Sequence, residues 1–155
     1  MALLKEHSPE INSLRDVSLE LLDEHKDEMD EVTYMRCSYV IEENMRLEAA
    51  CEALLEKNFE EFGKQMYGSH YGLKDKYEVS CPELDQLVVI AEECEGVIGA
   101  RMMGGGFGGC TINLVRKDAV DSLSQHITNN YQTPQGEPPL IIIAQIEQGV
   151  HKLPK

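Results

Sequence analysis

The chain has 155 residues, of which 42% are hydrophobic and 27% charged, and its formal net charge is −14 at pH 7. A chain of this length buries roughly two thirds of the surface that its unfolded form exposes, so we expect one globular domain. The acidic balance disfavours nucleic-acid binding and adsorption to anionic membranes, which require clustered lysine and arginine. By itself it identifies no partner.

The N-terminus carries charged residues in place of an apolar signal core, and no segment approaches the length of a membrane span. The five cysteines are odd in number and widely spaced, and they form no C-x-x-C pair. This pattern is typical of reduced thiols in the core of a cytoplasmic protein. The five histidines are also scattered, so we expect no metal site built from protein ligands alone.

The first part of the chain is predicted to be helical after an irregular lead-in over residues 1–13. Ser18 can cap a helix that runs to about Asp30. The pattern from about Thr33 to Lys57 indicates a long helix with two apolar stripes, which predict burial on two sides. One stripe contains Tyr34, Cys37, Ile41 and Met45, and the other contains Val40, Leu47, Cys51 and Leu54.

Asn58 can cap a further helix, and Ser80 with Glu83 forms a capping box for the helix after it, which ends near Cys94. The apolar face of the first of these helices includes His70, at helical spacing with Phe59, Phe62, Met66 and Leu73. His70 is either a packed, hydrogen-bonded core histidine or a catalytic base. Its place on the apolar face favours the first interpretation, and we assign no catalytic role to it.

The second part of the chain contains the predicted strands. Residues 98–103 and 110–115 alternate with the period of a strand, and a helix is expected to begin at Asp118. After a turn-rich connection, the apolar run from Leu140 to Ala144 predicts a buried strand. This order of elements predicts an α+β fold, in which helices cover a short and mostly antiparallel sheet.

A glycine-rich segment joins the first two strands, with five glycines in six residues. Such a run is costly in conformational entropy, so it indicates positive φ angles or a ligand close to the backbone. Its consecutive amides can form an anion-binding nest. The spacing Gly-x-Gly-x-x-Gly matches the dinucleotide fingerprint, but a strand and not a helix follows, which excludes a Rossmann fold. We therefore predict a phosphate-facing loop.

The segment from Gly99 to Cys110 closely resembles the third conserved motif of the galactokinase branch of the GHMP sugar kinases. Further segments that resemble this family are Leu14–Val17, Arg36 with Glu43–Asn44 and Glu48–Ala50, Ser69–His70, and Tyr77–Leu87. The likeness identifies residues 14–155 as the C-terminal domain of such a kinase. The chain departs from the family pattern at Gly72, where serine is usual, and at Met103, where threonine is common.

The resemblance implies a ferredoxin-like domain that takes part in the ATP-dependent phosphorylation of galactose to galactose 1-phosphate. It also implies ATP and Mg²⁺ in the intact enzyme. No segment resembles the N-terminal lobe, which carries the Gly-Glu-His sugar signature, a second phosphate loop and the catalytic aspartate and arginine. We therefore expect no catalytic residue, no bound cofactor and no activity in the isolated chain. The missing lobe is its expected partner, and self-association is expected through the surface that this lobe would cover.

The resemblance assigns the nucleotide-binding role to the loop Gly104, Gly105, Gly106, Phe107, Gly108 and Gly109. Arg101 is a weaker candidate, because a strand arginine beside the loop can contact phosphate or equally pair with a carboxylate. Phe107 is expected to anchor packing rather than to stack on a base. Two alternatives stay open: a non-catalytic sugar- or nucleotide-sensing or interaction domain, and the C-terminal half of another GHMP sugar kinase.

Overall fold

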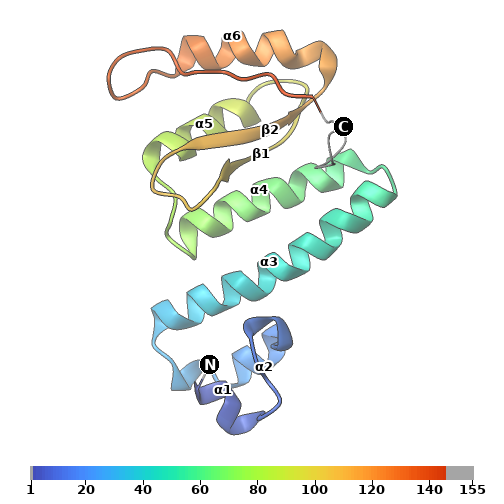
Figure 1. Cartoon of the computed structure of the whole chain (residues 1–155), viewed down its shortest axis with the longest axis vertical. Coiled ribbons are helices and arrows are strands. Elements are labelled where there is room, and N and C mark those ends of the chain that lie inside the picture. The colour runs from blue at the N-terminus through green and yellow to red at the C-terminus, as the bar shows by residue number, and fades with distance from the viewer. Residues whose placement is uncertain (1, 146–155) are drawn as a thin grey trace, which may run out of the picture.

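The computed structural model describes residues 2–145 of the chain. Helices make up its first half, and a pair of strands lies between helices in its second half (Figure 1). The helices and strands in chain order are α1 Ala2–His7, α2 Leu19–Glu24, α3 Glu31–Leu55, α4 Phe59–Asp75, α5 Pro82–Glu92, β1 Val97–Met103, β2 Cys110–Val115 and α6 Val120–Asn130. Three short 3₁₀ helices are η1 Leu14–Asp16, η2 Lys26–Glu28 and η3 Lys117–Ala119. The predicted α+β class is confirmed.

The two strands form an antiparallel hairpin in which Met103 pairs with Cys110 next to the glycine loop. Helix α4 lies along β1, α5 packs on both strands, and α6 packs on α5. Helix α3 crosses beyond α4, and α1 and α2 lie on the far side of α3 (Figure 1). This arrangement puts the glycine loop at the end of the hairpin where α4 ends and α5 begins. The predicted strands at 98–103 and 110–115 are confirmed to within one residue.

Two separate clusters of buried side chains stabilise the fold. The loop-bearing core, as we call the larger one, is drawn from α5, β1 and α6 and consists of Val88, Ile90, Ala91, Cys94, Ala100, Leu123, Ile127 and Tyr131. The N-terminal cluster consists of Leu4, Ile11, Val17, Leu22 and Ile41. Ala100 and Met102, on one face of β1, are both buried, and the buried residues of α5 and α6 recur at helical spacing, which explains why these segments meet in one core.

The predicted irregular lead-in over residues 1–13 is wrong for residues 2–7, which form α1. Leu4 is 1% exposed and Ile11 is 2% exposed, because both pack into the N-terminal cluster. A helix of six residues is not stable by itself in water. Burial of Leu4 against α2 and α3 therefore stabilises α1. No local sequence pattern predicts this helix.

The long helix α3 confirms the prediction for residues 33–57, but its second apolar stripe is not buried. Leu47 is 64% exposed and Leu54 is 46% exposed, and Cys51 is also exposed. In the first stripe Ile41 is buried, whereas Met45 is 55% exposed. The side of α3 that faces α4 instead carries Tyr39, whose ring lies over Gly72. The first stripe is thus confirmed at Tyr34, Cys37 and Ile41, which pack in the N-terminal cluster. On the side that faces α4, the buried residues differ from those that the apolar pattern indicates.

The cap predicted at Asn58 is confirmed, since its side chain accepts a hydrogen bond from the Glu61 N–H. The capping box predicted at Ser80 is wrong, because α5 begins one residue later and its N-cap is Cys81. The Ser80 hydroxyl instead donates to Asp85 Oδ1 over 2.6 Å. Its short side chain is therefore used to tie the segment before α5 to the helix.

The buried strand predicted for Leu140–Ala144 is also wrong. These residues form no strand, and Leu140 is 87% and Ile142 78% exposed. A strand needs a neighbour that completes its hydrogen bonds, and β1 and β2 pair only with each other among residues 2–145. The remainder of the predicted domain, residues 146–155, lies outside the described part of the chain.

All five cysteines are free thiols, as predicted, although Cys94 alone is fully buried and Cys51 and Cys110 are exposed. In the described range 2–145, none of the helices combines the length and apolarity that crossing a membrane requires.

Candidate functional site: the glycine loop

The glycine loop, residues 104–109, has a backbone that side chains would hinder. Four of its glycines have positive φ, with values of +88° at Gly104, +87° at Gly106, +132° at Gly108 and +106° at Gly109. Glycine adopts these conformations without the steric penalty that a Cβ brings. The geometry therefore explains most of the glycine run that the sequence displays.

One contact fixes the loop to the rest of the domain. The Phe107 N–H donates to the Val79 carbonyl oxygen over 2.8 Å. A Cβ on Gly106 would lie only 2.0 Å from that same oxygen. Gly106 is thus required by close packing against the segment between α4 and α5, independently of any ligand.

Gly105 is different from its neighbours. Its φ is not positive, and a Cβ built on it would meet nothing within 4 Å. Neither strain nor packing within residues 2–145 therefore requires glycine at this position. A side chain here would project into open space, which is the space that a ligand or another domain would occupy.

The loop has the chemistry of an anion site. Within residues 2–145, the N–H groups of its five glycines have no protein hydrogen-bond acceptor. Successive amides of this kind offer partial positive charge to phosphate or carboxylate oxygens. Four of its six residues, Gly104, Gly105, Phe107 and Gly109, are exposed. The loop is consequently an open rim.

Phe107 does not anchor packing, contrary to the prediction. Its side chain is 77% exposed, and its φ of +59° is unusual for a bulky residue. The hydrogen bond from the Phe107 N–H to the Val79 carbonyl explains this backbone conformation, because it directs the amide toward the domain and leaves the ring in solvent. The exposed ring is a contact surface available to a ligand or a partner.

His70 is a fully buried residue on α4 that contacts β1 just before the loop. Its Nδ1 accepts a hydrogen bond from the Met102 N–H over 3.3 Å, so the neutral imidazole carries its proton on Nε2. That Nε2 lies 3.5 Å from Asp85 Oδ1, and no group in the described range accepts a hydrogen bond from it. Burial lowers the pKa of His70, and the Asp85 carboxylate opposes this shift. His70 is thus the packed histidine that its helical spacing favours.

Asp85 connects His70 to the loop support. Its Oδ1 accepts from the Ser80 hydroxyl over 2.6 Å, and its Oδ2 lies 3.5 Å from Lys74 Nζ. Ser80 directly follows Val79, whose carbonyl fixes the loop. The chain of contacts therefore runs from β1 through His70 and Asp85 to the segment under Gly106 and Phe107.

Arg101 lies in a network of polar side chains between β1 and α3. Its Nη1 donates to Ser69 Oγ over 3.1 Å and lies 3.8 Å from Glu43 Oε1. The Ser69 hydroxyl donates to the same Glu43 oxygen over 2.6 Å, and Arg46 Nε binds the other oxygen over 2.9 Å. The geometry corresponds to the carboxylate-pairing alternative for Arg101. A phosphate contact by Arg101 stays a prediction.

Sequence reasoning finds the loop but misses Val79, because this residue acts through its main chain and no side-chain pattern marks it. It also misses Ser69, Glu43 and Asp85 as a connected set. A signal exists in the sequence, since all of them lie in segments that resemble the kinase family.

The comparisons with known proteins agree with this geometry. The family model described as GHMP kinases C terminal matches residues 50–133, which include α4, α5, both strands, the loop and α6. A galactokinase from Bos taurus is 46% identical over 119 residues, covering 77% of this chain and 30% of that protein. A galactokinase from Clostridium beijerinckii is 40% identical over 144 residues, covering 92% of this chain and 37% of the other.

Among solved structures, a crystal structure of Lactococcus lactis galactokinase complexed with galactose superposes with a TM-score of 0.80 at 38% identity. The match covers 88% of this chain and 36% of that one. The chain thus spans between 30% and 37% of the length of these relatives.

Proposed function

The chain belongs to the GHMP kinase family, and we propose that it forms the C-terminal half of a galactokinase active site. In this proposal the glycine loop lies against the phosphates of ATP while the γ-phosphoryl group passes to galactose, giving galactose 1-phosphate. The observation that carries the proposal is Gly105, where open space and an ordinary φ leave no reason internal to the described chain for glycine. The identity of 46% to a galactokinase favours this sugar kinase over others of the family.

The loop contributes by positioning charge. Phosphoryl transfer depends mainly on alignment and on stabilising the negative charge of the transferring group. The glycine N–H groups donate to phosphate oxygens without first having to break protein hydrogen bonds. The contact of Gly106 and Phe107 with Val79 holds these donors in place. ATP would supply the phosphoryl group, and Mg²⁺, held outside this chain, would neutralise part of its charge.

The carboxylates that support the loop do not fit as Mg²⁺ ligands. Asp85 is engaged by Ser80 and Lys74, and Glu43 by Ser69 and Arg46. Both would have to exchange these partners for the ion. We therefore assign the Mg²⁺ ligands, the catalytic base and the sugar contacts to an N-terminal kinase lobe.

That lobe is the partner that the proposal requires, and residues 2–145 alone are expected to show no turnover. The free thiols favour a reducing compartment, so the proposal places the protein in the cytoplasm. The exposed ring of Phe107 lies on the loop that the lobe would cover, so we expect self-association of the isolated chain through that surface. A strictly monomeric mass by light scattering at high concentration would contradict this last point.

The test joins this chain to an N-terminal galactokinase lobe and compares alanine substitutions. Gly105→Ala adds a methyl group to open space, so the fold should be unchanged while kcat/KM for ATP falls by about 10- to 100-fold. Gly68→Ala in α4 is the matched control, because its Cβ meets only the flexible Arg46 side chain at 3.2 Å. Steady-state turnover and thermal unfolding are measured on each protein.

Full activity of the Gly105→Ala protein would overturn the phosphate-facing role. A nucleotide titration of the chain alone, by calorimetry with Mg²⁺ and ATP, addresses the alternative of a sensing module. We expect no saturable binding, because the loop is an open rim. Saturable binding that Gly105→Ala abolishes would favour the non-catalytic sensing function.

A further inference from the structure

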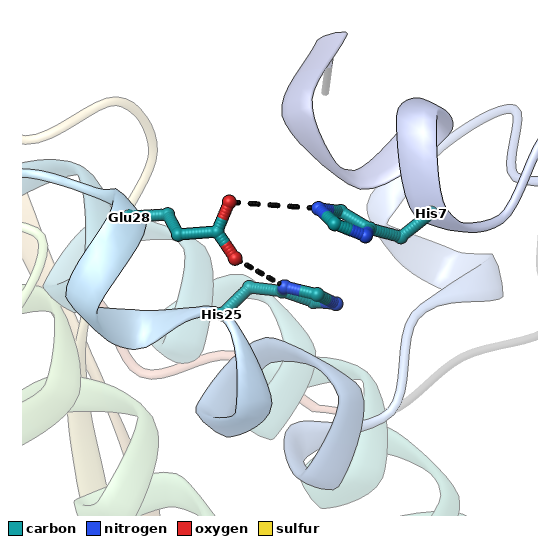
Figure 2. A group of neighbouring side chains, drawn as sticks. All are labelled: His7, His25 and Glu28. Atoms are coloured by element: carbon teal, nitrogen blue, oxygen red, sulfur yellow. Dashed lines mark hydrogen bonds and ion pairs between the residues drawn. The ribbon is translucent and has the colours of Figure 1, made fainter.

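A cluster of two histidines and a glutamate lies in the N-terminal part of the fold, on the far side of α3 from the glycine loop. His7 ends α1, His25 follows α2, and Glu28 lies in η2. One ligand atom from each of the three side chains lies within 4.8 Å of the others. Figure 2 shows both imidazoles meeting the Glu28 carboxylate from the same side.

The three side chains converge closely. His25 Nδ1 lies 2.7 Å from Glu28 Oε1, and His7 Nε2 lies 3.5 Å from Glu28 Oε2. The two rings stack with their centroids 3.8 Å apart and their planes inclined by 24° (Figure 2). Each imidazole therefore directs one ring nitrogen toward a different oxygen of the same carboxylate.

The N-terminal cluster holds these groups in place. His7 follows Leu4 by three residues in α1, and His25 follows Leu22 by three residues, so each imidazole lies about one helical turn beyond a buried leucine. Leu4 and Leu22 are 1% and 0% exposed and pack in the same cluster. Burial of the two leucines thus brings together two histidines that are distant in the sequence.

We propose that His7, His25 and Glu28 form a binding site for a divalent transition-metal ion of the Zn²⁺ type. Two imidazoles and a carboxylate are the donor set that Zn²⁺ and its neighbours in the first transition row accept. The exposed fractions of the His7 and Glu28 side chains are 41% and 45%, so solvent reaches the site and water can complete the coordination. With Zn–N and Zn–O bonds of about 2.0–2.2 Å, the ion would replace the proton between His25 Nδ1 and Glu28 Oε1 and move these two atoms, now 2.7 Å apart, slightly away from each other.

The ion would connect α1 to the segment from α2 to η2. A six-residue helix is marginal by itself, so a ligand shared between α1 and its neighbours stabilises the N-terminal cluster. The expectation of no metal site rests on histidines that are scattered in the sequence. That expectation does not anticipate the proximity that packing of Leu4 and Leu22 creates.

The test titrates the full chain, freed of metal with a chelator, with ZnCl₂ in a calorimeter. We expect one saturable site, and we expect His7→Gln and Glu28→Gln each to weaken it at least about tenfold. Both replaced side chains are more than a third exposed, so the variants should fold, which circular dichroism checks. His126→Gln, which removes another partly exposed histidine that faces a glutamate, is the matched control and should leave the affinity unchanged.

The exposed thiols of Cys51 and Cys110 are a competing source of Zn²⁺ binding. Co²⁺ in place of Zn²⁺ separates the two, because thiolate ligands give an intense near-ultraviolet charge-transfer band and nitrogen and oxygen ligands do not. The proposal requires that bound Co²⁺ show d–d absorption without the thiolate band. It also requires that this d–d absorption be lost in His7→Gln. Absence of saturable binding, a thiolate band, or equal affinity in all variants would overturn it.

A rise in the unfolding temperature with added Zn²⁺ is the second readout. It should occur in the parent chain and in His126→Gln, and it should disappear in His7→Gln and Glu28→Gln. An equal rise in all four proteins would place the ion elsewhere and so contradict the site.

Discussion

The loop-bearing core and the N-terminal cluster are built in different ways, although both bury aliphatic side chains. The loop-bearing core joins α5, β1 and α6, and all of its residues lie within the range that the family model matches. The N-terminal cluster is formed by residues 4–41, which lie before that range. In the part of the fold around the first, the Val79 carbonyl holds the glycine loop by a main-chain contact, whereas the second brings polar side chains together at the surface.

This contrast determines where substitutions are tolerated. Where α4 lies along β1, the backbones approach so closely that a methyl group is excluded, as at Gly63, where a Cβ would lie 1.8 Å from the Ile98 carbonyl oxygen. In the N-terminal cluster, side chains set the spacing, as the packing of Leu4 and Leu22 illustrates. The two regions should therefore fail separately when they are perturbed.

Leu22→Ala gives the largest expected effect and perturbs only the N-terminal cluster. Leu22 is 0% exposed, and removing such a side chain leaves a cavity that costs about 2–5 kcal/mol of the free energy of unfolding. Hydrogen exchange should show lost protection in α1 and α2 while β1 and β2 keep theirs. Leu55→Ala, at a position 85% exposed in α3, is the control and should change little. Equal loss of protection in the strands would contradict the separation of the two regions.

Gly63→Ala perturbs the other region. The added methyl group would meet the backbone of β1, which cannot yield as a side chain does, so we expect a cost at the upper end of the range of about 1–3 kcal/mol for overpacking. Denaturant unfolding measures this cost, and hydrogen exchange should locate it in α4 and β1. The control Gly68→Ala lies on the same helix, against the flexible Arg46 side chain. Equal stability of the two variants would contradict the close backbone contact between α4 and β1 at Gly63.

His70→Asn is expected to change how stability depends on pH. The unfolded chain binds a proton at the ordinary histidine pKa of about 6.5, whereas burial lowers the pKa of His70 in the folded chain. The unfolded state then holds more protons below pH 6.5, so the stability that neutral His70 contributes is complete above that pH and decreases as the pH falls. The slope is at most about 1.4 kcal/mol per pH unit for one proton.

Asparagine can accept the Met102 N–H bond in place of Nδ1 but cannot be protonated in this range. Urea unfolding between pH 5 and pH 8 should therefore show a shallower pH dependence for His70→Asn than for the parent chain. Identical slopes would mean that His70 is protonated equally easily in the folded and the unfolded chain. Asp85 and Lys74, the charged groups beside His70, are retained in both proteins.

Local patterns predicted the parts of the fold in which side chains alternate or repeat regularly. The two strands follow from alternation, the cap at Asn58 from its side chain, and the loop from its glycines. The interface between α3 and α4 could not be predicted in this way. The Tyr39 ring packs so closely on Gly72 that a Cβ at this glycine would lie 2.7 Å from the ring, and the Glu43 carboxylate accepts a hydrogen bond from Ser69. The buried side of α3 is therefore partly polar, and its apolar stripe is partly exposed.

The candidate site was predictable to a similar extent. The glycines predict the loop, but nothing in the sequence predicts its support by the Val79 carbonyl, because main-chain contacts leave no residue signature. The exposure of Phe107 is unpredictable for the same reason, since it follows from the direction of the backbone N–H. His7 and His25 require the tertiary packing of two leucines, and no spacing in the sequence encodes that contact.

The smallest change in stability is expected in the polar network that joins Arg101 on β1 to Ser69 on α4 and Glu43 on α3. Glu43→Gln keeps the shape of the side chain and its acceptor for the Ser69 hydroxyl, but it removes the charge that faces Arg101 and Arg46. Because the Arg101 and Glu43 side chains are 36% and 30% exposed, solvent screens the pair and we expect a loss of less than about 1 kcal/mol. A double-mutant cycle with Arg101→Gln measures the coupling energy by denaturant unfolding.

A coupling energy of zero would mean that Arg101 does not depend on Glu43, which would leave its guanidinium free for the phosphate contact that the family resemblance allows. A measurable coupling, together with unchanged kcat/KM for ATP in the Arg101→Gln protein joined to the N-terminal lobe, would assign Arg101 to the support of the loop.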